Sequence, residues 1–262
     1  MRFSPLLSIV IPTLAADRSW ITLLYDLLDL ELDFEVIVVC PDISRLRSIL
    51  REEIKLIEKG IDLYTTRKSP PNTDNSPTVI RLLESEQGRA KQMNAGAIEA
   101  RGEFVLFLHG DSRLSKTALN SLAAALQTKC YPENRLLYYC LKFANDGPPL
   151  MKLNEWGVRF RSSFFKLPFG DQGFCLKLQT FLNLGGFNET AACAEDLLFV
   201  IAARKAEIEL RSLPETIITS ARKYRRYGWL KTTAHHLLVT LSLTLREWFL
   251  LHKEQNLLPE EL

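Results

Sequence analysis

The segment FVLFLHGDSRL, residues 104–114, joins a strand-forming apolar run to side chains that could do chemistry. Phe104–Leu108 is typical of a buried strand, and His109, Gly110 and Asp111 follow at its C-terminal end. A carboxylate there could hold Mg²⁺, which proteins bind through one or two carboxylates together with substrate phosphate oxygens. Gly110 would let the chain turn so that Asp111 faces a crevice. The alternative is that Asp111 caps the following helix, because Asp-Ser before a helical run is also a cap signal.

A second group of polar residues lies in GRAKQMNAGAIEARGE, 88–103. Arg89 opens a helix there, where free backbone N–H groups and a guanidinium could meet an anion, and Gln92 and Asn94 could reach the same crevice. Further along, Glu195 and Asp196 begin another predicted helix. Ordinary explanations exist for both: an amphipathic helix in the first case, and acids that complement the helix dipole in the second.

The elements that must position these residues alternate between strand and helix. Four buried strands are expected in the first half, each followed by a helical or polar segment, and this order predicts a mainly parallel sheet covered on both faces. Ligands of such sheets bind at the carboxyl ends of the strands. The expected strands are 8–12, 35–40, 79–83 and 104–108, and the expected helices are 19–30, a stretch from Ser44, 89–100 and 116–127.

The second half is less regular. Residues 65–78 hold three prolines and are expected to form an exposed loop, and no linker divides the chain. Strands are expected at 136–143, 173–178, 207–213 and 216–219, and helices at 195–206 and at the C-terminus.

Composition excludes several classes. The net charge of +2 gives no global field for nucleic acid, and five cysteines without a CxxC pair favour a reduced, cytoplasmic protein. The first apolar run is short and closed by Pro12, which favours a strand over a signal peptide. The leucine-rich C-terminal segment is interrupted by charges, so a helix packed on the domain is favoured over one at a membrane interface. Neither GxGxxG nor GxxxxGK[ST] is present, so the dinucleotide and P-loop modes of phosphate binding are unsupported.

Five motifs in order resemble glycosyltransferase family 2. They are IVIPT at 9–13, EVIVV at 35–39, GRAKQMNAGAIEARGEFVLFLHGDS at 88–112, LGGFNE at 184–189 and AED at 194–196. The series GRA…QMNxGA, FLHxD, GDQG (170–173) and GGF…ED is similar to a small subgroup of that family. The resemblance spans roughly residues 6–228. It implies the GT-A fold, a mainly parallel α/β sheet flanked by helices, as a domain over 1–228 with a helical C-terminal extension over 229–262.

The resemblance also implies roles for single residues. Asp111 matches the last Asp of the DxD motif, which binds a divalent cation, Mn²⁺ or Mg²⁺, that bridges the donor diphosphate. Asp196 matches the catalytic base. The residues expected to bind substrate are Thr13, Asp42, Arg89, Gln92, Asn94, His109, Asp171, Gln172, Glu195 and, in the basic segment 220–228, Arg222.

Two positions depart from the family pattern. His109 stands where the family usually has the first Asp of DxD, which weakens the case for tight Mg²⁺ binding and leaves Mn²⁺ open. The second strand usually ends in Asp, whereas here it ends in Cys40 with Asp42 two residues later.

The resulting expectation is a cytoplasmic glycosyltransferase that moves a sugar from a nucleotide-diphosphate donor to an acceptor hydroxyl by metal-assisted inverting displacement. A nucleotidyltransferase and an inactive nucleotide-sugar-binding or scaffold protein are the alternatives. The acceptor is unknown and could be lipid-linked. A peripheral membrane contact through the C-terminal helix and a homodimer are left open, and no nucleic-acid partner is expected. Tyr138, Tyr139, Trp156, Phe164 and Phe165 could line an acceptor groove, although core positions are favoured for them.

Overall fold

The structure is a computed structural model that describes residues 5–14, 17–28, 33–52, 62–65, 78–128 and 134–255. Within these ranges the strands are β1 Leu7–Pro12, β2 Phe34–Cys40, β3 Asp62–Thr65, β4 Thr78–Glu84, β5 Phe104–Phe107, β6 Arg113–Leu114, β7 Arg135–Phe143, β8 Phe174–Lys177 and β9 Glu209–Thr219. The helices are α1 Ser19–Leu28, α2 Ile43–Glu52, α4 Arg89–Glu99, α5 Lys116–Leu126, α6 Met151–Phe164, the 3₁₀ turn η1 Gly170–Gln172, α7 Leu178–Asn183, α8 Glu195–Lys205, α9 Arg222–Tyr227 and α10 Trp229–Gln255.

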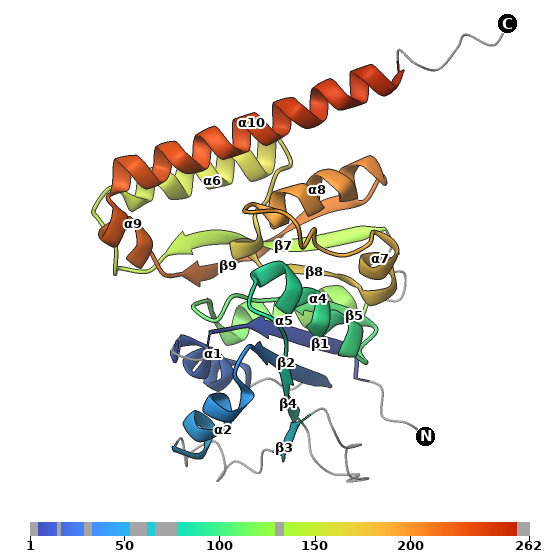
Figure 1. Ribbon diagram of the computed structural model, residues 1–262, viewed down its shortest axis with the longest axis vertical. Coiled ribbons are helices and arrows are strands. Elements are labelled where there is room, and N and C mark those ends of the chain that lie inside the picture. The colour runs from blue at the N-terminus through green and yellow to red at the C-terminus, as the bar shows by residue number, and fades with distance from the viewer. Residues whose placement is uncertain are drawn as a thin grey trace, which may run out of the picture.

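The described strands form one sheet in the order β3-β4-β2-β1-β5-β8-β7-β9-β6 (Figure 1). The pairings from β3 to β5 are parallel, as is β7 with β9, whereas β8 is antiparallel to both of its neighbours and β6 is antiparallel to β9. The expected α/β class with a mainly parallel sheet flanked by helices is confirmed. In the parallel part the C-terminal ends of β1, β2 and β5 point to the same edge.

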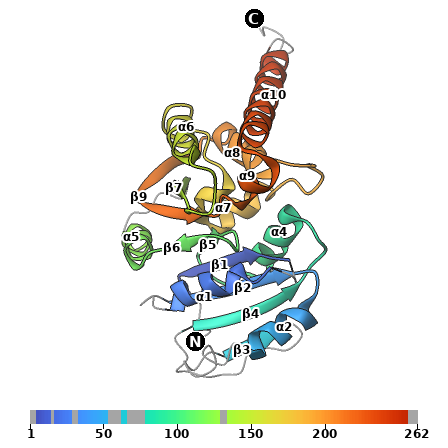
Figure 2. The same ribbon diagram turned by 90° about the vertical axis from the view of Figure 1, so that its left-hand side faces the viewer.

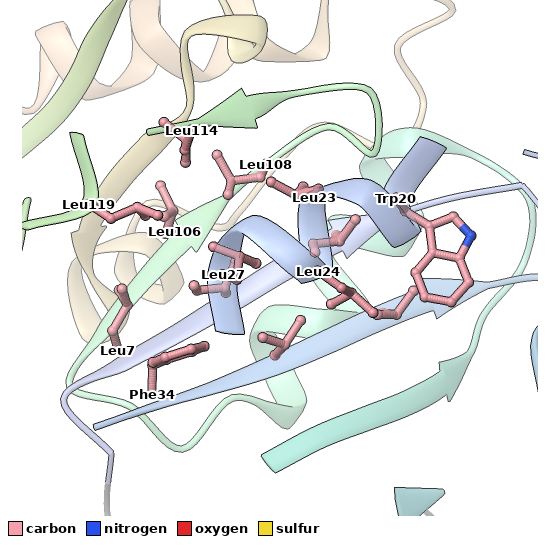
Figure 3. Packing of buried hydrophobic residues seen from close by; sticks show 14 of the residues in the cluster. Leu7, Trp20, Leu23, Leu24, Leu27, Phe34, Leu106, Leu108, Leu114 and Leu119 are labelled. Carbon is pink, nitrogen blue, oxygen red and sulfur yellow. The ribbon is translucent and has the colours of Figure 1, made fainter. Parts of the chain in front are cut away.

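Each face of the sheet is covered by helices because the strands are apolar on both sides. Alternate residues of β1 divide between the faces: Ile9 and Ile11 pack with α1, α2 and α5, and Val10 packs with α4, α7 and α8. Figure 3 shows Trp20 and three leucines of α1 over β1, β2 and β5. Figure 2 shows α6, α9 and α10 at the opposite end of the molecule from β3.

Most of the expected elements are present, with shifted bounds. The helix expected over 19–30 ends at Leu28 in the described part, the helix expected from Ser44 begins at Ile43, and β5 ends at Phe107. Of the loop expected over 65–78, the two end residues belong to β3 and β4, and the residues between them lie outside the described part.

The two strands expected over 207–219 are one strand, β9. Its pairing with β7 is irregular between Tyr138 and Cys140, opposite Ser212 and Thr216. Pro214 lies in that interval and has no N–H to donate to a ladder, which explains why the sequence pattern suggested a break.

Several elements were not expected from the sequence: β3, β6, α6, α7, η1 and α9. In the described part no helix is both long enough and sufficiently apolar to cross a membrane. Four of the five cysteines lie in the described part and are free; they are Cys40, Cys140, Cys175 and Cys193.

Candidate active site

The site is built where several chain segments end beside one another. The C-terminal ends of β1, β2 and β5 bring their following loops to one edge of the sheet, and α4 begins there too. From the second half of the chain come η1, the first turn of α8 and the basic helix α9.

Asp196 is buried in the first turn of α8 and its carboxylate is fixed by main-chain donors. Oδ2 accepts a hydrogen bond from the Gly170 N–H at 2.8 Å, and Oδ1 accepts one from the Leu197 N–H at 2.9 Å. Burial alone would raise the pKa of this carboxyl, but Arg89 and the two N–H donors outweigh burial and lower it. Asp196 is therefore an oriented anion at neutral pH.

A glycine at position 170 suits this geometry. A Cβ at that position would lie 3.1 Å from the Asp196 Cβ and 3.4 Å from His109 Nε2. The loop main chain can approach Asp196 closely enough to donate its hydrogen bond because no side chain intervenes.

Arg89 and Glu195 form a direct ion pair beside Asp196. The Arg89 Nε donates to Glu195 Oε1, and the Arg89 side chain remains half-exposed. Burial opposes the charge on Arg89, but Glu195, Asp196 and Asp171 outweigh burial and raise its pKa. A permanent cation thus stands next to the anionic Asp196 with part of its surface open to a ligand.

His109 is neutral in this setting. Burial, together with the nearby Arg89, lowers its pKa to about 3, although Asp196 acts in the opposite direction. Its Nε2 faces Gly170, which is the residue that donates to Asp196. The imidazole therefore adds no positive charge at neutral pH.

Asp111 lies at the open side of the same loop. Ser115, rather than Asp111, caps the helix that follows, because its Oγ accepts from the Ala118 N–H at 3.1 Å. The capping alternative for Asp111 is therefore wrong. Its side chain is 30% exposed, and burial raises its pKa even though Arg222 opposes this.

Arg222 extends from α9 across the strand ends. Its Nη2 lies 3.9 Å from Asp111 Oδ2 and 3.9 Å from Asp17 Oδ2, which follows β1. Asp146 fixes the start of α9, accepting from the Ser220 hydroxyl at 2.5 Å and from the Ala221 N–H at 2.8 Å. The basic segment therefore covers the Asp111 side of the site.

Three further charged or titratable residues belong to this cluster; Lys223 lies in the basic segment expected here, whereas Arg161 and His236 were not expected from the sequence. Arg161 comes from α6, and burial lowers its pKa to about 10 while Asp171 and Asp196 oppose the shift. Lys223 acts electrostatically on His109, Asp111 and Asp171. His236 of α10 has a pKa lowered to about 4 by burial and by Lys223. No sequence motif marks Arg161 or His236, and His236 lies 40 residues after Asp196 in the chain.

Asp171 and Arg161 each keep a polar atom without a partner. Asp171 Oδ1 and Arg161 Nη2 are buried and make no hydrogen bond in the described part of the chain. The Arg161 guanidinium stacks over the Phe169 ring, with its Cζ 3.2 Å from the ring centroid. Burial raises the pKa of Asp171, against the effect of Arg161. Buried polar atoms without partners are rare in folded proteins, so these two atoms have hydrogen-bonding capacity that the described residues do not use.

Two of the expected substrate ligands instead bind protein main chain. Gln92 is 3% exposed, and its Nε2 donates to the carbonyl oxygens of Thr13 and Val39, both at 2.8 Å. Gln172 is also buried; its amide oxygen accepts from Ser162 Oγ and Phe169 N–H, and its Nε2 donates to the Tyr139 carbonyl. Gln92 thus ties together the ends of β1 and β2, and Gln172 fixes the loop that presents Asp171. Their direct contact with substrate stays a prediction.

Asn94 joins α4 to the GGF segment. Its Nδ2 donates to the Phe187 carbonyl at 2.8 Å, and its Oδ1 accepts from the Phe187 N–H at 2.9 Å. Gly186 has φ +71°, and a Cβ there would lie 2.7 Å from Asn94 Oδ1, which explains the glycine. Asp42 is exposed and its Oδ1 accepts from the Arg45 N–H at the start of α2, so the structure gives it a capping role.

The aromatic residues considered for an acceptor groove separate into two groups. Tyr138 and Tyr139 are buried in the core, and each hydroxyl donates to a main-chain carbonyl. Trp156, Phe164 and Phe165 are exposed, so the core positions favoured for them are wrong.

No family model matches the chain, and no curated protein matches it by sequence. Solved structures do match. A crystal structure of S. aureus TarS 1–349 superposes with a TM-score of 0.56 at 20% identity, and the same fragment in complex with UDP-GlcNAc with 0.57 at 19%. The matches cover 82% of this chain and 60% and 58% of those chains. The mannosyltransferase PcManGT from Pyrobaculum calidifontis, in complex with GDP-Man and Mn²⁺, has a TM-score of 0.63 at 15% identity, covering 94% of this chain and 65% of that one.

The chain has a glycosyltransferase fold of the GT-A type. At these identities the likeness establishes the arrangement of strands and helices. The chain spans less than two thirds of the length of each of these structures.

The residues at the site can be tested against the divalent cation that this fold implies. The Asp111 carboxylate is partly exposed, and its 3.9 Å separation from Arg222 exceeds hydrogen-bond distance, so it can accept a new ligand. Among the described residues no three His, Cys, Asp or Glu side chains come together as a metal site. One carboxylate is enough for Mg²⁺ when substrate phosphates supply further oxygens. Asp111 therefore fits a cation that arrives with a diphosphate rather than one resident in the protein.

Proposed function

We propose that the chain transfers a sugar from a nucleotide-diphosphate donor to an acceptor hydroxyl by a single inverting displacement. The observation that supports this most is the oriented, ionised Asp196 beside Arg89, at the edge of the sheet where Asp111 and Arg222 also lie. The fold supports the donor class, since two structures that share it are complexes with UDP-GlcNAc and with GDP-Man and Mn²⁺.

Asp196 is the proposed catalytic base. The acceptor oxygen forms a bond to the anomeric carbon while the bond from that carbon to the diphosphate oxygen breaks, and the acceptor proton passes to Asp196. Its two N–H donors hold the carboxylate in one orientation, which a base needs in order to meet the acceptor hydroxyl. A positioned base contributes about 10²–10⁴-fold to such a reaction.

The low pKa of Asp196 in the free protein fits this role once a donor is bound. Arg89 is the largest influence that lowers this pKa. The negative charge of a donor diphosphate bound across the site offsets the positive charge of Arg89 felt by Asp196, so the pKa of the carboxyl rises. Donor binding therefore makes Asp196 a stronger base, since a carboxylate whose pKa is nearer to the working pH accepts a proton more readily.

Asp111 and Arg222 are the proposed diphosphate side of the site. Asp111 would hold the divalent cation, Mn²⁺ or Mg²⁺, whose charge neutralises the departing diphosphate when it is bound. Arg222 contributes a guanidinium suited to phosphate oxygens and, in the free protein, balances Asp111 and Asp17. The partly unsatisfied pair Arg161 and Asp171 is placed to bind hydroxyl or phosphate groups of sugar or acceptor.

The test compares Asp196→Asn with Asp111→Asn, using Glu209→Gln at an exposed ion pair with Arg135 as the matched control. Transfer to water from a panel of UDP- and GDP-sugars requires no known acceptor and gives the rate. Calorimetry with UDP and GDP, with and without Mn²⁺, gives the affinity. We expect Asp196→Asn to lose about 10²–10⁴-fold in rate with its nucleotide affinity retained, and Asp111→Asn to lose the Mn²⁺-dependent part of the affinity.

Contrary results would identify the alternatives. An Asp196→Asn protein as active as the Glu209→Gln control would overturn the base assignment. Nucleotide binding without turnover by the wild type would indicate a nucleotide-sugar-binding protein, and no binding at all would indicate a scaffold. The cytoplasmic location, a homodimer and the division at residue 228 stay predictions.

A further inference from the structure

The outward face of α6 is a row of exposed aromatic side chains. Trp156, Phe160 and Phe164 follow one another along the helix with ring centroids 5.7 and 5.3 Å apart and planes within 9° of parallel. Trp156 is 65% exposed and Phe164 is 70% exposed, and Phe165 extends the row. Large aromatic rings stacked together in solvent are unusual, and contiguous exposed apolar patches mark interaction sites.

A second exposed apolar row runs along α10. Its members recur at helical spacing, so they share one face of the helix. They are Leu230, Leu237, Leu238, Leu241 and Leu245. The start of α10 is joined to α6 through Asn154, which accepts from the Trp229 indole N–H at 2.6 Å and donates to Thr233 Oγ1 at 3.0 Å. Both helices lie at the end of the molecule away from β3 (Figures 1 and 2).

The charges on these segments are mainly positive. Residues 220–246, which form α9 and most of α10, contain six Lys or Arg and no Asp or Glu. Residues 147–170, around α6, contain four Lys or Arg and one Glu. Lys152 and Arg159 are exposed on α6 beside the aromatic row, and Lys166 follows its end. The whole-chain charge of +2 therefore conceals a strongly basic end of the molecule.

We propose that this end, the exposed faces of α6 and α10 with their basic flanks, docks on a membrane surface that contains anionic phospholipid. Exposed Trp, Phe and Leu with flanking Lys and Arg are the composition of helices that lie in the interface, where apolar groups enter the acyl boundary and basic groups meet anionic headgroups. A second copy of the chain is disfavoured as the occupant, because an isologous contact would bring the same basic charges face to face.

The docking surface and the site share two elements. The α6 helix that displays Trp156 outward places Arg161 beside Asp171 and Asp196 on its inward side. The α9 helix, with Arg222 over Asp111, leads directly into α10. A membrane bound here therefore lies next to the site. The docking proposal itself is independent of the reaction proposed above.

The experiment is vesicle flotation of the full chain without any nucleotide. Vesicles of phosphatidylcholine alone are compared with vesicles of phosphatidylcholine and phosphatidylglycerol. The aromatic variant combines Trp156→Ser, Phe160→Ser and Phe164→Ser, and the charge variant combines Lys152→Gln and Arg159→Gln. The matched control is Ile98→Ser, which alters a residue that is 72% exposed on α4. Circular dichroism checks that each variant is folded.

We expect the wild type and the control to float with the anionic vesicles, with less binding at high salt. The aromatic variant should lose flotation. The charge variant should bind about thirtyfold more weakly, which corresponds to about 2 kcal/mol for two basic side chains near an anionic surface. Failure of the wild type to bind anionic vesicles would overturn the proposal. So would a wild-type dimer, seen by sedimentation velocity, that the aromatic substitutions convert to monomer, because the face would then belong to a second copy.

Discussion

Gln92 offers the sharpest test of how the site is held, because sequence and structure assign it different roles. The sequence predicts a substrate ligand, whereas the structure shows its Nε2 donating to the carbonyl oxygens of Thr13 and Val39. Gln92→Met keeps the length and nearly the volume of the side chain but removes the donor. The substitution therefore isolates the two hydrogen bonds.

The expected loss of stability depends on which hydrogen bonds the two carbonyl oxygens retain in Gln92→Met. The Val39 oxygen retains the Thr13 N–H at 2.9 Å, and Gln92 is the donor that the structure shows for the Thr13 oxygen. Leaving a buried carbonyl without a partner costs about 1–3 kcal/mol, and losing one of two donors costs about 1 kcal/mol. We expect Gln92→Met to lower the free energy of unfolding by about 2–4 kcal/mol.

Urea unfolding at neutral pH measures this free energy, with Gln179→Met on the surface of α7 as the control. Gln179 bonds only to the exposed Asn183 among the described residues, so its replacement should change stability by about 0.5 kcal/mol or less. If Gln92→Met proved as stable as the control but lost affinity for nucleotide, Gln92 would be a ligand and the structural reasoning would be refuted.

Two more predictions concern the electrostatics of the site and the position of α9. Because Arg89 lowers the pKa of Asp196, Arg89→Gln should raise that pKa, so the acid limb of a pH profile of donor hydrolysis should move to higher pH. Arg89→Lys keeps the charge, and its profile should stay close to that of the wild type. An unshifted profile for Arg89→Gln would contradict the electrostatic effect of Arg89 on Asp196. Asp146→Ala removes the acceptor of the Ser220 and Ala221 hydrogen bonds, which hold the start of α9 and so position Arg222. Calorimetry should show nucleotide affinity about tenfold weaker, although Asp146 itself does not contact the proposed ligand; unchanged affinity would show that α9 needs no such anchor.

The edge of the sheet that holds the site was predictable from sequence. Continuous apolar strands such as 35–40 alternate with helices, and that order requires parallel strands whose C-terminal ends meet. His109, Asp111 and Arg89 are placed at that edge by position alone. That Asp196 would lie at this edge was expected only from the resemblance of its segment to a family motif. The residue pattern by itself does not show that the first turn of α8 lies opposite β5.

The environment of α6 was not predictable from its residues. Helical spacing shows that Trp156, Phe160 and Phe164 share a face, but spacing is the same for a face that meets the core and one that meets solvent. The usual burial of aromatic side chains favoured the core. In the structure the apolar face points outward and Arg161 points inward, so the helix is inverted relative to the common arrangement.

The departure of His109 from the family pattern has a physical explanation in the geometry around Asp196. The His109 Nε2 and Asp196 Oδ2 both lie within 3.4 Å of the place that a Cβ of Gly170 would occupy. A carboxylate at position 109 would set a second negative charge beside Asp196 and raise the pKa of both groups. The imidazole, whose pKa is about 3, is neutral there and leaves Asp196 ionised under the influence of Arg89. His109 at this position is therefore compatible with Asp196 as the proposed base, and the proposed cation would then depend on Asp111 and the phosphates of the donor.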